Sequence, residues 1–374
     1  MLVKQTHEGV LRKKHCLVFF FVGLLLFSLF LVETKSSYAE ELPAFYRGIR
    51  PLGMGNAFIA VSDDENGLFY NPAGLKLESG EEGVGILNPL GEISEGSLDF
   101  YNDYSDLNTD NASEISAFLN DRIGEHQHLR VRLLPYIFVS PFAIGILAQA
   151  TGDMEVRNPV FPEVASNLRT DIGVVVGGAR DFGRGILGGM TVKYIQRDGL
   201  VKTYTAVDIA SNTFDLGDDL KSNSDFSFDL GGMVHLSEWT TIDQWDLIAG
   251  IVLQNITDLD FKENGVHPMQ LNLGAAIHPE IGFVKSTVAL DFVDITQELG
   301  TDKDLLKRTH LGAEFKFPKI VSLRVGVNQG YFTGGVTFDF WVVRLDVATF
   351  SEELGAYAGQ REDRRTLAQL SFGF

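Results

Sequence analysis

The chain has 374 residues, a formal net charge of −19 and a single cysteine. A chain this acidic repels phosphate, which argues against nucleic-acid binding, and one cysteine excludes a disulfide framework. The 39 glycines and 28 phenylalanines are heavy usage for a soluble domain.

Residues 1–39 are predicted to be an export signal. Basic residues come first, Leu17–Val32 is nearly all apolar, and Ser37-Tyr38-Ala39 has the small-x-small pattern that signal peptidase cleaves. An uncleaved anchor is the alternative, but this apolar stretch is marginally short for a membrane span. Cys16 precedes the apolar stretch, so it leaves with the signal and is poorly placed for lipid attachment. We expect the mature chain to begin at Glu40.

Residues 40–80 are dense in turn signals around one short apolar run. Glycine permits tight turns, and proline both lacks an N–H and biases the preceding residue away from helix. We interpret this stretch as a compact N-terminal plug, or hatch, inside a barrel; an ordinary loop-rich entry to a domain is the alternative. The residues that mark it are Gly53, Gly55, Asn56, Asp63, Asp64, Asn71, Pro72, Ala73 and Gly74.

Beyond residue 80 the apolar residues recur with a period of two. In 321–327, for example, four apolar residues alternate with Ser322, Arg324 and Gly326. Alternation at this length is the strand signal, and a tilted strand of this length crosses a bilayer. Strands are predicted near 82–88, 128–138, 141–150, 169–179, 185–196, 225–236, 245–254, 269–278, 283–292, 308–317, 320–328, 331–338, 341–349 and 364–374.

The connections between these strands alternate between long and short, with one tight exception at Gln329-Gly330. A soluble β-sandwich would also alternate along each strand, but it would not predict this parity of loop lengths. An even number of strands, short turns at one end and long loops at the other are typical of bacterial outer-membrane barrels. We therefore predict an all-β, transmembrane antiparallel β-barrel of about 14 strands over residues 81–374.

Two further stretches stand out. The first long loop reads as a short helix from Asn111 to Gln127, with Ser113 as its cap and Phe118 and Leu119 on an apolar stripe. Such a helix serves either as a packing lid or as a contact for a lipid-like ligand.

The final strand is the second landmark. From Thr366 the apolar residues Ala368, Leu370, Phe372 and Phe374 alternate up to the terminal aromatic residue. This ending resembles the signal that the outer-membrane barrel-insertion machinery recognises, and it also suits a last strand that faces lipid.

The hatch stretch carries a family resemblance. Gly53-Met54-Gly55-Asn56-Ala57, Asp63-Asp64 and Asn71-Pro72-Ala73-Gly74-Leu75 resemble the FadL/TodX-like outer-membrane transporters of hydrophobic compounds, including their PorV-like and TraF-like relatives. The resemblance implies a hatch inside a fourteen-stranded barrel. It says nothing of the substrate, and the rest of the chain matches only in pattern, so no pocket residues can be carried over.

The polar strand faces carry mixed charge, including Arg324, Arg344 and Asp346. Charges that face a lumen must pair, because an unpaired buried charge is costly. We expect a structural network, with Asp63 or Asp64 pairing with a cation such as Arg324 or Arg344. A sharper interpretation is that some of these charges bind the head group of an amphiphile while Phe58 and Leu68 hold its tail.

No catalytic constellation, cofactor motif or metal pattern is predicted. His126 and His128 are two residues apart, but no nearby carboxylate or cysteine completes a metal site, and we expect solvated loop histidines. An outer-membrane hydrolase would need an acid–base or nucleophile cluster at the barrel rim, which the sequence does not indicate.

The functional expectation is a monomeric outer-membrane channel for passive uptake of hydrophobic or amphipathic small molecules such as long-chain fatty acids. The alternative is a PorV-like barrel that binds secreted or envelope proteins through its acidic outer loops. The expected partners are outer-membrane lipid, a hydrophobic ligand and the insertion machinery, with no nucleic acid.

Overall fold

The computed structural model describes residues 41–77, 82–105, 107, 111–211, 220–239, 245–300, 303–318 and 320–373. The chain divides into two compact units, Met1–Ser37 and Tyr38–Phe374, and all the described residues belong to the second. The predicted export signal and Phe374 lie outside the described residues. Within those residues, no helix is long and apolar enough to cross a membrane.

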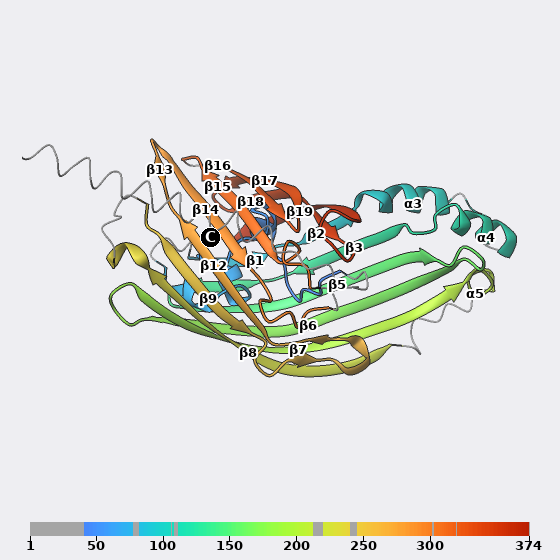
Figure 1. Cartoon of the computed structure of the whole chain (residues 1–374), viewed down its shortest axis with the longest axis horizontal. Helices are drawn as coiled ribbons and strands as arrows, with labels where there is room; N and C mark the ends of the chain where they lie inside the picture. Colours follow the sequence, from blue (N-terminus) through green and yellow to red (C-terminus); the bar gives the residue numbers. More distant parts are fainter. Residues whose placement is uncertain are drawn as a thin grey trace, which may run out of the picture. The chain divides into compact units, whose positions relative to one another are not determined.

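The described strands form a closed antiparallel barrel with fourteen passes, which confirms the predicted fold (Figure 1). Three passes consist of two successive strands each: β1 with β2, β3 with β4, and β12 with β13. The barrel strands are β1 (Gly83–Leu87), β2 (Leu90–Ser94), β3 (His126–Leu133), β4 (Tyr136–Val139), β5 (Phe142–Arg157), β6 (Glu163–Asp181), β7 (Ile186–Thr205), β8 (Lys221–His235), β9 (Ile248–Gln254), β12 (Gln270–Ile277), β13 (Glu280–Ile281), β14 (Val284–Phe292), β15 (Thr309–Lys316), β16 (Val321–Asn328), β17 (Tyr331–Phe340), β18 (Val343–Glu353) and β19 (Glu362–Gly373).

The barrel closes through its last strand. In β19, Leu367 pairs with Ala348 of β18 on one side and with Glu92 of β2 on the other, so no edge is left open at the seam. Closure satisfies the strand hydrogen bonds internally, which a bilayer requires. A small hairpin of β10 (Leu259–Asp260) and β11 (Val266–His267) stands apart from this sheet.

The outer face of the wall is apolar, whereas the inner face carries charged side chains along with apolar ones that pack against the N-terminal segment. In β16 the side chains of Leu323 and Val325 are 43% and 56% exposed, whereas Arg324 between them is 5% exposed. The apolar stripe therefore faces outward, where a bilayer would cover it. Large exposed aromatic residues gather at the end with the short turns: Phe142, Phe182, Trp245, Phe283, Phe317 and Trp341.

Trp341 itself differs from the expectation. It was predicted to begin a strand, but it lies in the two-residue turn between β17 and β18, with φ of 70°. Tight hairpins need a left-handed backbone at this place, and the turn leaves the indole 96% exposed at the level of the other aromatic residues.

The wall is much taller on one side. β6 and β7 have 19 and 20 residues, whereas β15 and β16 have eight each. A bilayer needs only about 9–11 residues per tilted strand, so the tall strands continue well beyond it. Figure 1 shows this extension carrying three helices at its far end: α3 (Glu95–Ser105), α4 (Ala112–Asn120) and α5 (Ala206–Ala210).

The loop helix is shorter than predicted and has another cap. α4 ends at Asn120, and its N-cap is Asn111, whose side chain accepts a hydrogen bond from the backbone N–H of Ser113. Ser113 lies inside the helix because Asn111 already satisfies the free N–H groups of the first turn. The chain turns after residue 120 and enters β3 at His126. Helix α3 was not predicted.

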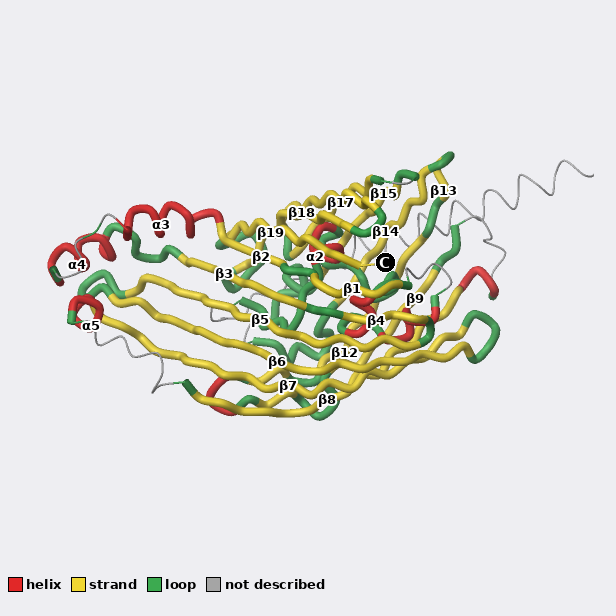
Figure 2. The backbone as a smooth tube through the Cα atoms, turned by 180° about the vertical axis from the view of Figure 1, so that it is seen from behind, coloured by secondary structure: helices red, strands yellow, loops and turns green. Residues whose placement is uncertain are grey.

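The N-terminal segment, residues 41–77, lies within the ring of strands. It contains α2 (Ile49–Gly53) and two short 3-10 helices, η1 (Glu65–Leu68) and η2 (Pro72–Lys76), and nearly all its side chains are buried. Its hydrogen bonds reach β3, β5, β8, β14, β15 and β17, which stand on different sides of the closed wall. Figure 2 shows α2 and the adjoining loops surrounded by strands.

Candidate functional site

The candidate site is the boundary between the N-terminal segment and the inner face of the barrel. Its centre is Arg50 on α2. One guanidinium nitrogen of Arg50 lies 2.6 Å from Asp63 and 2.7 Å from Asp64, and two others donate to Glu314 of β15 at 2.7 and 2.9 Å. Glu314 also accepts from Arg324 of β16 at 2.7 Å.

This network corrects the expected pairing of the acidic pair. The cation that Asp63 and Asp64 share is Arg50, a residue of the segment itself. Arg324 enters the network through Glu314 and approaches Asp346 at 3.5 Å, while Arg344 pairs with Asp339 at 2.8 Å near the short turns. The sequence pattern placed Arg324 and Asp346 on an inward face, but it could not show that α2 brings Arg50 between them and the acidic pair.

The Gly53-Met54-Gly55-Asn56 motif lets the segment touch the wall backbone to backbone. Gly55 has φ of 63°, and a Cβ there would lie 2.2 Å from the carbonyl oxygen of Leu311 in β15. The Oγ1 of Thr333 accepts from the Gly55 N–H at 2.9 Å and donates to the Gly53 carbonyl at 3.2 Å. Asn56 also has a positive φ and accepts a hydrogen bond from the Tyr70 hydroxyl at 2.5 Å.

The Asn71-Pro72-Ala73-Gly74 motif makes the same kind of contact on another side of the barrel. The Asn71 side chain caps η2 and donates to the carbonyls of Ile59 and, in β8, Gly232. A Cβ on Gly189 of β7 would lie 2.4 Å from the Pro72 carbonyl. Glycines in the wall thus make room for the segment, since a residue without a Cβ allows two backbones to approach closely.

One wall residue of this boundary, Asp291, is expected from the sequence only as one of many inward-facing charges that must find a partner. Asp291 of β14 is fully buried and accepts from the backbone N–H groups of Phe58 and Ile59 at 2.5 and 2.8 Å. Its only sequence signal was an inward position on an alternating strand, which many other polar residues share.

The four side chains predicted to hold a ligand lie in packed clusters. Phe58 and Leu68 are fully buried in the apolar core of the segment. Phe118 and Leu119 pack with Ile115, Val156 and other apolar residues at the far end of the tall strands. None of the four lines either of the two cavities at the segment, so ligand binding by them stays a prediction.

Two cavities flank the N-terminal segment. The short-turn cavity, about 320 Å³, lies between the segment and the barrel end with the short turns, and it is lined in part by Tyr136, Phe317 and Trp341. The long-loop cavity, about 100 Å³, lies on the side of the long loops, among Phe45, Phe69 and several amide side chains of the wall.

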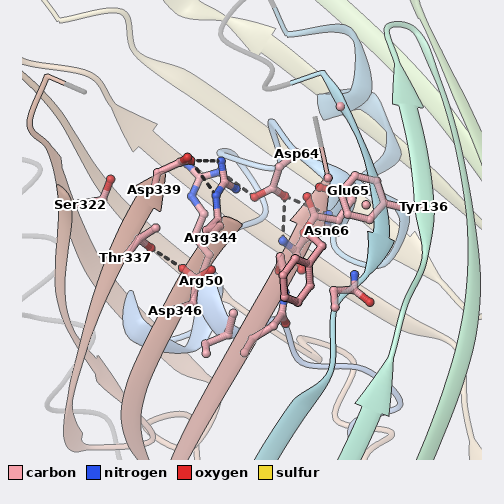
Figure 3. Close-up of a pocket in the computed structure, with 18 of the residues that line it drawn as sticks. Arg50, Asp64, Glu65, Asn66, Tyr136, Ser322, Thr337, Asp339, Arg344 and Asp346 are labelled. Atoms are coloured by element: carbon pink, nitrogen blue, oxygen red, sulfur yellow. Dashed lines mark hydrogen bonds and ion pairs between the residues drawn. The ribbon is translucent and has the colours of Figure 1, made fainter. Parts of the chain in front are cut away.

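The short-turn cavity has a lining of mixed polarity, in which positive and negative side chains are equal in number (Figure 3). The figure shows Arg50 and Asp64 near one another and Arg344 next to Asp339. Burial and then the adjacent charge of Asp64 raise the pKa of Glu65 from 4.5 to about 8. The charged lining residues are Arg50, Arg132, Lys316, Arg324, Arg344, Asp64, Glu65, Glu82, Asp339 and Asp346.

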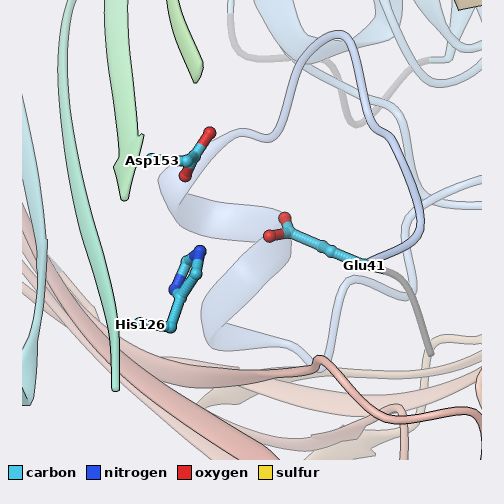
Figure 4. A group of neighbouring side chains, drawn as sticks. All are labelled: Glu41, His126 and Asp153. Carbon is cyan, nitrogen blue, oxygen red and sulfur yellow. The ribbon is translucent and has the colours of Figure 1, made fainter. Parts of the chain in front are cut away.

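The fold brings carboxylates to His126 that the sequence did not indicate. Glu41 and Asp153 approach His126 closely enough for the three to share a cation (Figure 4). These groups already have partners: Glu41 lies 2.8 Å from Arg365, and Asp153 lies 3.2 Å from Arg169. The group is therefore one part of a larger charge network at the long-loop end.

The histidine expectation is corrected as well. His128 is a buried wall residue of β3, not a solvated loop residue, because the strand begins earlier than predicted. Its two ring nitrogens lie 3.1 Å from Glu92 and 2.5 Å from Asp153.

Of the two residues of the predicted assembly signal, Phe372 lies within the described chain. At the other end of the wall, it pairs with Leu87 of β1 and Val343 of β18, close to the end of the described residues.

Solved structures with the same fold are known, although their sequences are distant. The toluene transporter TbuX of Ralstonia pickettii matches with a TM-score of 0.50 and 12% identity, over 87% of this chain and 97% of its own. The toluene transporter TodX of Pseudomonas putida has a TM-score of 0.48 and 12% identity, over 89% and 99%. The monoaromatic hydrocarbon channel CymD has a TM-score of 0.46 and 12% identity, over 89% and 97%.

No family model matches the chain, and no curated protein sequence matches it. The likeness to TbuX concerns the fold, since the identity is too low to carry residue roles. It agrees with the closed ring of fourteen passes and with the resemblance expected from the hatch motif. The chain therefore has the transmembrane β-barrel fold seen in TbuX.

Proposed function

We propose that this protein is a passive outer-membrane channel for hydrophobic or amphipathic small molecules, and that its N-terminal segment is a hatch between two cavities. The observation that carries the proposal is the position of these cavities on either side of the segment inside a closed barrel. The described similarity to a toluene transporter supports the same class of solute. Within this class, long-chain fatty acids are the specific solute that we propose.

The size of the short-turn cavity suits a small ligand. Its volume of about 320 Å³ falls at the lower end of the usual range for small-molecule sites. An apolar ligand gains on the order of 25 cal/mol per Å² buried, so a few hundred Å² suffices for micromolar affinity. The charged lining favours a solute that also has a polar group, which keeps amphiphiles in the candidate class.

Removal of the whole hatch from the barrel would cost much free energy. Removing it would separate Arg50 from Glu314 and strip Asp291 from the Phe58 and Ile59 N–H groups. Breaking a buried ion pair typically costs about 3–5 kcal/mol. Passage by local rearrangement is therefore favoured over ejection of the hatch.

The remaining parts of the proposal follow from the sequence. We propose export through a signal cleaved after Ala39, insertion in the outer membrane, a hatch over residues 40–80 and a monomeric barrel over residues 81–374. In such a barrel the short turns face the periplasm, so solute would enter from the long-loop end.

Uptake into proteoliposomes tests this function. We would compare labelled toluene, a labelled long-chain fatty acid and a labelled sugar of similar mass, in vesicles with and without the protein. Faster entry of an apolar solute, with no change for the sugar, is the expected result. Equal entry of all three solutes in both kinds of vesicle would contradict the channel.

The second candidate function is binding of an envelope or secreted protein. It is favoured by Val160 and Phe161, which are each 74% exposed in the loop between β5 and β6 at the far end of the tall strands. Exposed apolar side chains there would lie in water, where they suit a protein contact. Crosslinking from an introduced Phe161→Cys in intact cells tests it, with Asn120→Cys of α4 as the matched exposed control.

A further inference from the structure

One residue belongs to the linings of both cavities. Tyr46 lies in the segment just before α2, and it borders the short-turn cavity on one side and the long-loop cavity on the other. Among the residues that the structure describes, no other occurs in both linings. Tyr46 therefore lies between the two cavities.

The ring of Tyr46 occupies a slot made by two other side chains. It stacks on Phe69 with a centroid distance of 3.8 Å and an interplanar angle of 12°. The guanidinium carbon of Arg132, from β3, lies 4.4 Å from the Tyr46 ring centroid. A stacked ring and a cation this close cannot share one face, so the phenol lies between them.

Tyr46 is held in the segment by ring contacts and one hydrogen bond, and not by ion pairs. Its hydroxyl donates one hydrogen bond, 2.8 Å long, to Oδ1 of Asn66. By contrast, Arg47 on the next position pairs with Glu352, and Arg50 pairs with three carboxylates. Rotation of the Tyr46 side chain breaks no ion pair, whereas movement of the segment breaks several.

We propose that Tyr46 is the partition between the two cavities, and that its side-chain rotation joins them while the rest of the segment stays in place. This inference rests on the proposed channel function, which gives the joined cavities a solute to carry. The slot between Phe69 and Arg132 has the shape of one aromatic ring with a cation on one face. A planar aromatic molecule is the solute that would exchange with Tyr46 most readily, because it restores both contacts.

Ion conductance across planar bilayers tests the partition without any hydrophobic solute. Tyr46→Ala should raise the single-channel conductance several-fold, because the two cavities would then communicate. Tyr46→Phe should remain at the wild-type level, since it loses only the bond to Asn66. The matched control is Phe138→Ala, which removes a fully buried aromatic ring of β4 that lines neither cavity and should leave the conductance unchanged.

Added p-cresol, the free counterpart of the tyrosine side chain, sharpens the test. It should occupy the vacated slot in Tyr46→Ala and lower the conductance again, as ring-shaped ligands fill cavities left by removed side chains. It should have no effect on the conductance of the wild type or of Phe138→Ala. An increase in Tyr46→Ala that p-cresol does not reverse would overturn the slot.

Folding of each variant is checked by the gel shift between unheated and heated samples. Should Tyr46→Ala lose this shift, Tyr46→Leu provides the same test with more of the core volume kept. A folded Tyr46 variant with wild-type conductance overturns the partition. Uptake of toluene is measured in parallel: absence of uptake in the wild type refutes the channel function, whereas conductance alone decides the role of Tyr46.

Discussion

The N-terminal segment and the far end of the tall strands are both additions to a barrel, and buried ion pairs hold the first in addition to the apolar packing that both have. The segment is fixed to the wall by Arg50, Glu314 and Asp291 and by backbone contacts at glycines. At the far end, Ile115, Phe118 and Leu119 form an apolar cluster with the strands. A membrane barrel can carry charges on its inner face, so an inner element can be held by ion pairs in addition to the apolar packing that it shares with the wall, whereas the cluster at the far end is apolar.

The largest expected effect comes from Arg50→Ala. It leaves Asp63, Asp64 and Glu314 without their shared cation, which should destabilise the folded barrel by about 3–5 kcal/mol. The change is measured as the midpoint temperature at which the protein, heated in detergent, loses the gel migration of the folded barrel. Arg157→Ala is the control, since the Arg157 side chain is 60% exposed. An unchanged midpoint for Arg50→Ala would mean that the network does not hold the segment.

The next effect tests the backbone contact. Gly55→Ala must adopt a positive φ and bring a Cβ against Leu311, so it should cost more than about 1 kcal/mol. Gly359→Ala has a similar φ of 83° but open space around it, and it isolates the cost of φ alone. The difference between the two midpoints in thermal unfolding reports the contact with the wall. Equal midpoints would show that the segment can move away from β15.

A smaller and local effect is expected at the far end. Leu119→Ala should loosen the apolar cluster by about 2–5 kcal/mol while the membrane barrel stays intact. Limited proteolysis should cut the α3–α4 region faster, and the gel shift of the barrel should persist. The control is Asn120→Ala, whose side chain is exposed on the same helix. Loss of the gel shift in Leu119→Ala would show that the cluster and the barrel unfold together.

The smallest effect concerns pH. Burial and Asp64 raise the pKa of Glu65 to about 8, so the folded protein holds a proton there that the unfolded chain releases above about pH 4.5. The contribution of Glu65 to stability is therefore greatest below pH 4.5 and is lost as the pH rises to about 8. Glu65→Gln should make the midpoint temperature of unfolding less dependent on pH between pH 5 and pH 9. A parallel profile for the two proteins would exclude Glu65 as the titrating group.

Much of the barrel was predictable because its signal is local. Period-two alternation and loop lengths indicated the strands and their number, since each strand must present one face to lipid and one to the interior. The Gly-Met-Gly-Asn-Ala and Asn-Pro-Ala-Gly motifs marked a segment of tight turns. Their glycines serve the close backbone approach for which glycine is suited.

Helix boundaries were less predictable because neighbouring residues compete. Asn111 and Ser113 are both good caps, and only the backbone of the folded loop shows that Asn111 takes the position. Helix α3 has no strong apolar stripe of its own, and it packs through Phe100 against Phe118 of α4. That contact joins residues from two helices across a loop, so neither helix alone indicated it.

By itself the sequence determined the class of fold, the number of passes, the inward polar face and the place of the N-terminal segment in the chain. The tertiary structure decided which charges meet, because Arg50 and Glu314 are 264 residues apart and pair only once the barrel closes. It also decided that Phe58 and Leu68 pack in the core while Tyr46 borders both cavities. Periodicity shows which face a side chain occupies, but the neighbour on that face depends on long-range closure, for which a single sequence holds no local signal.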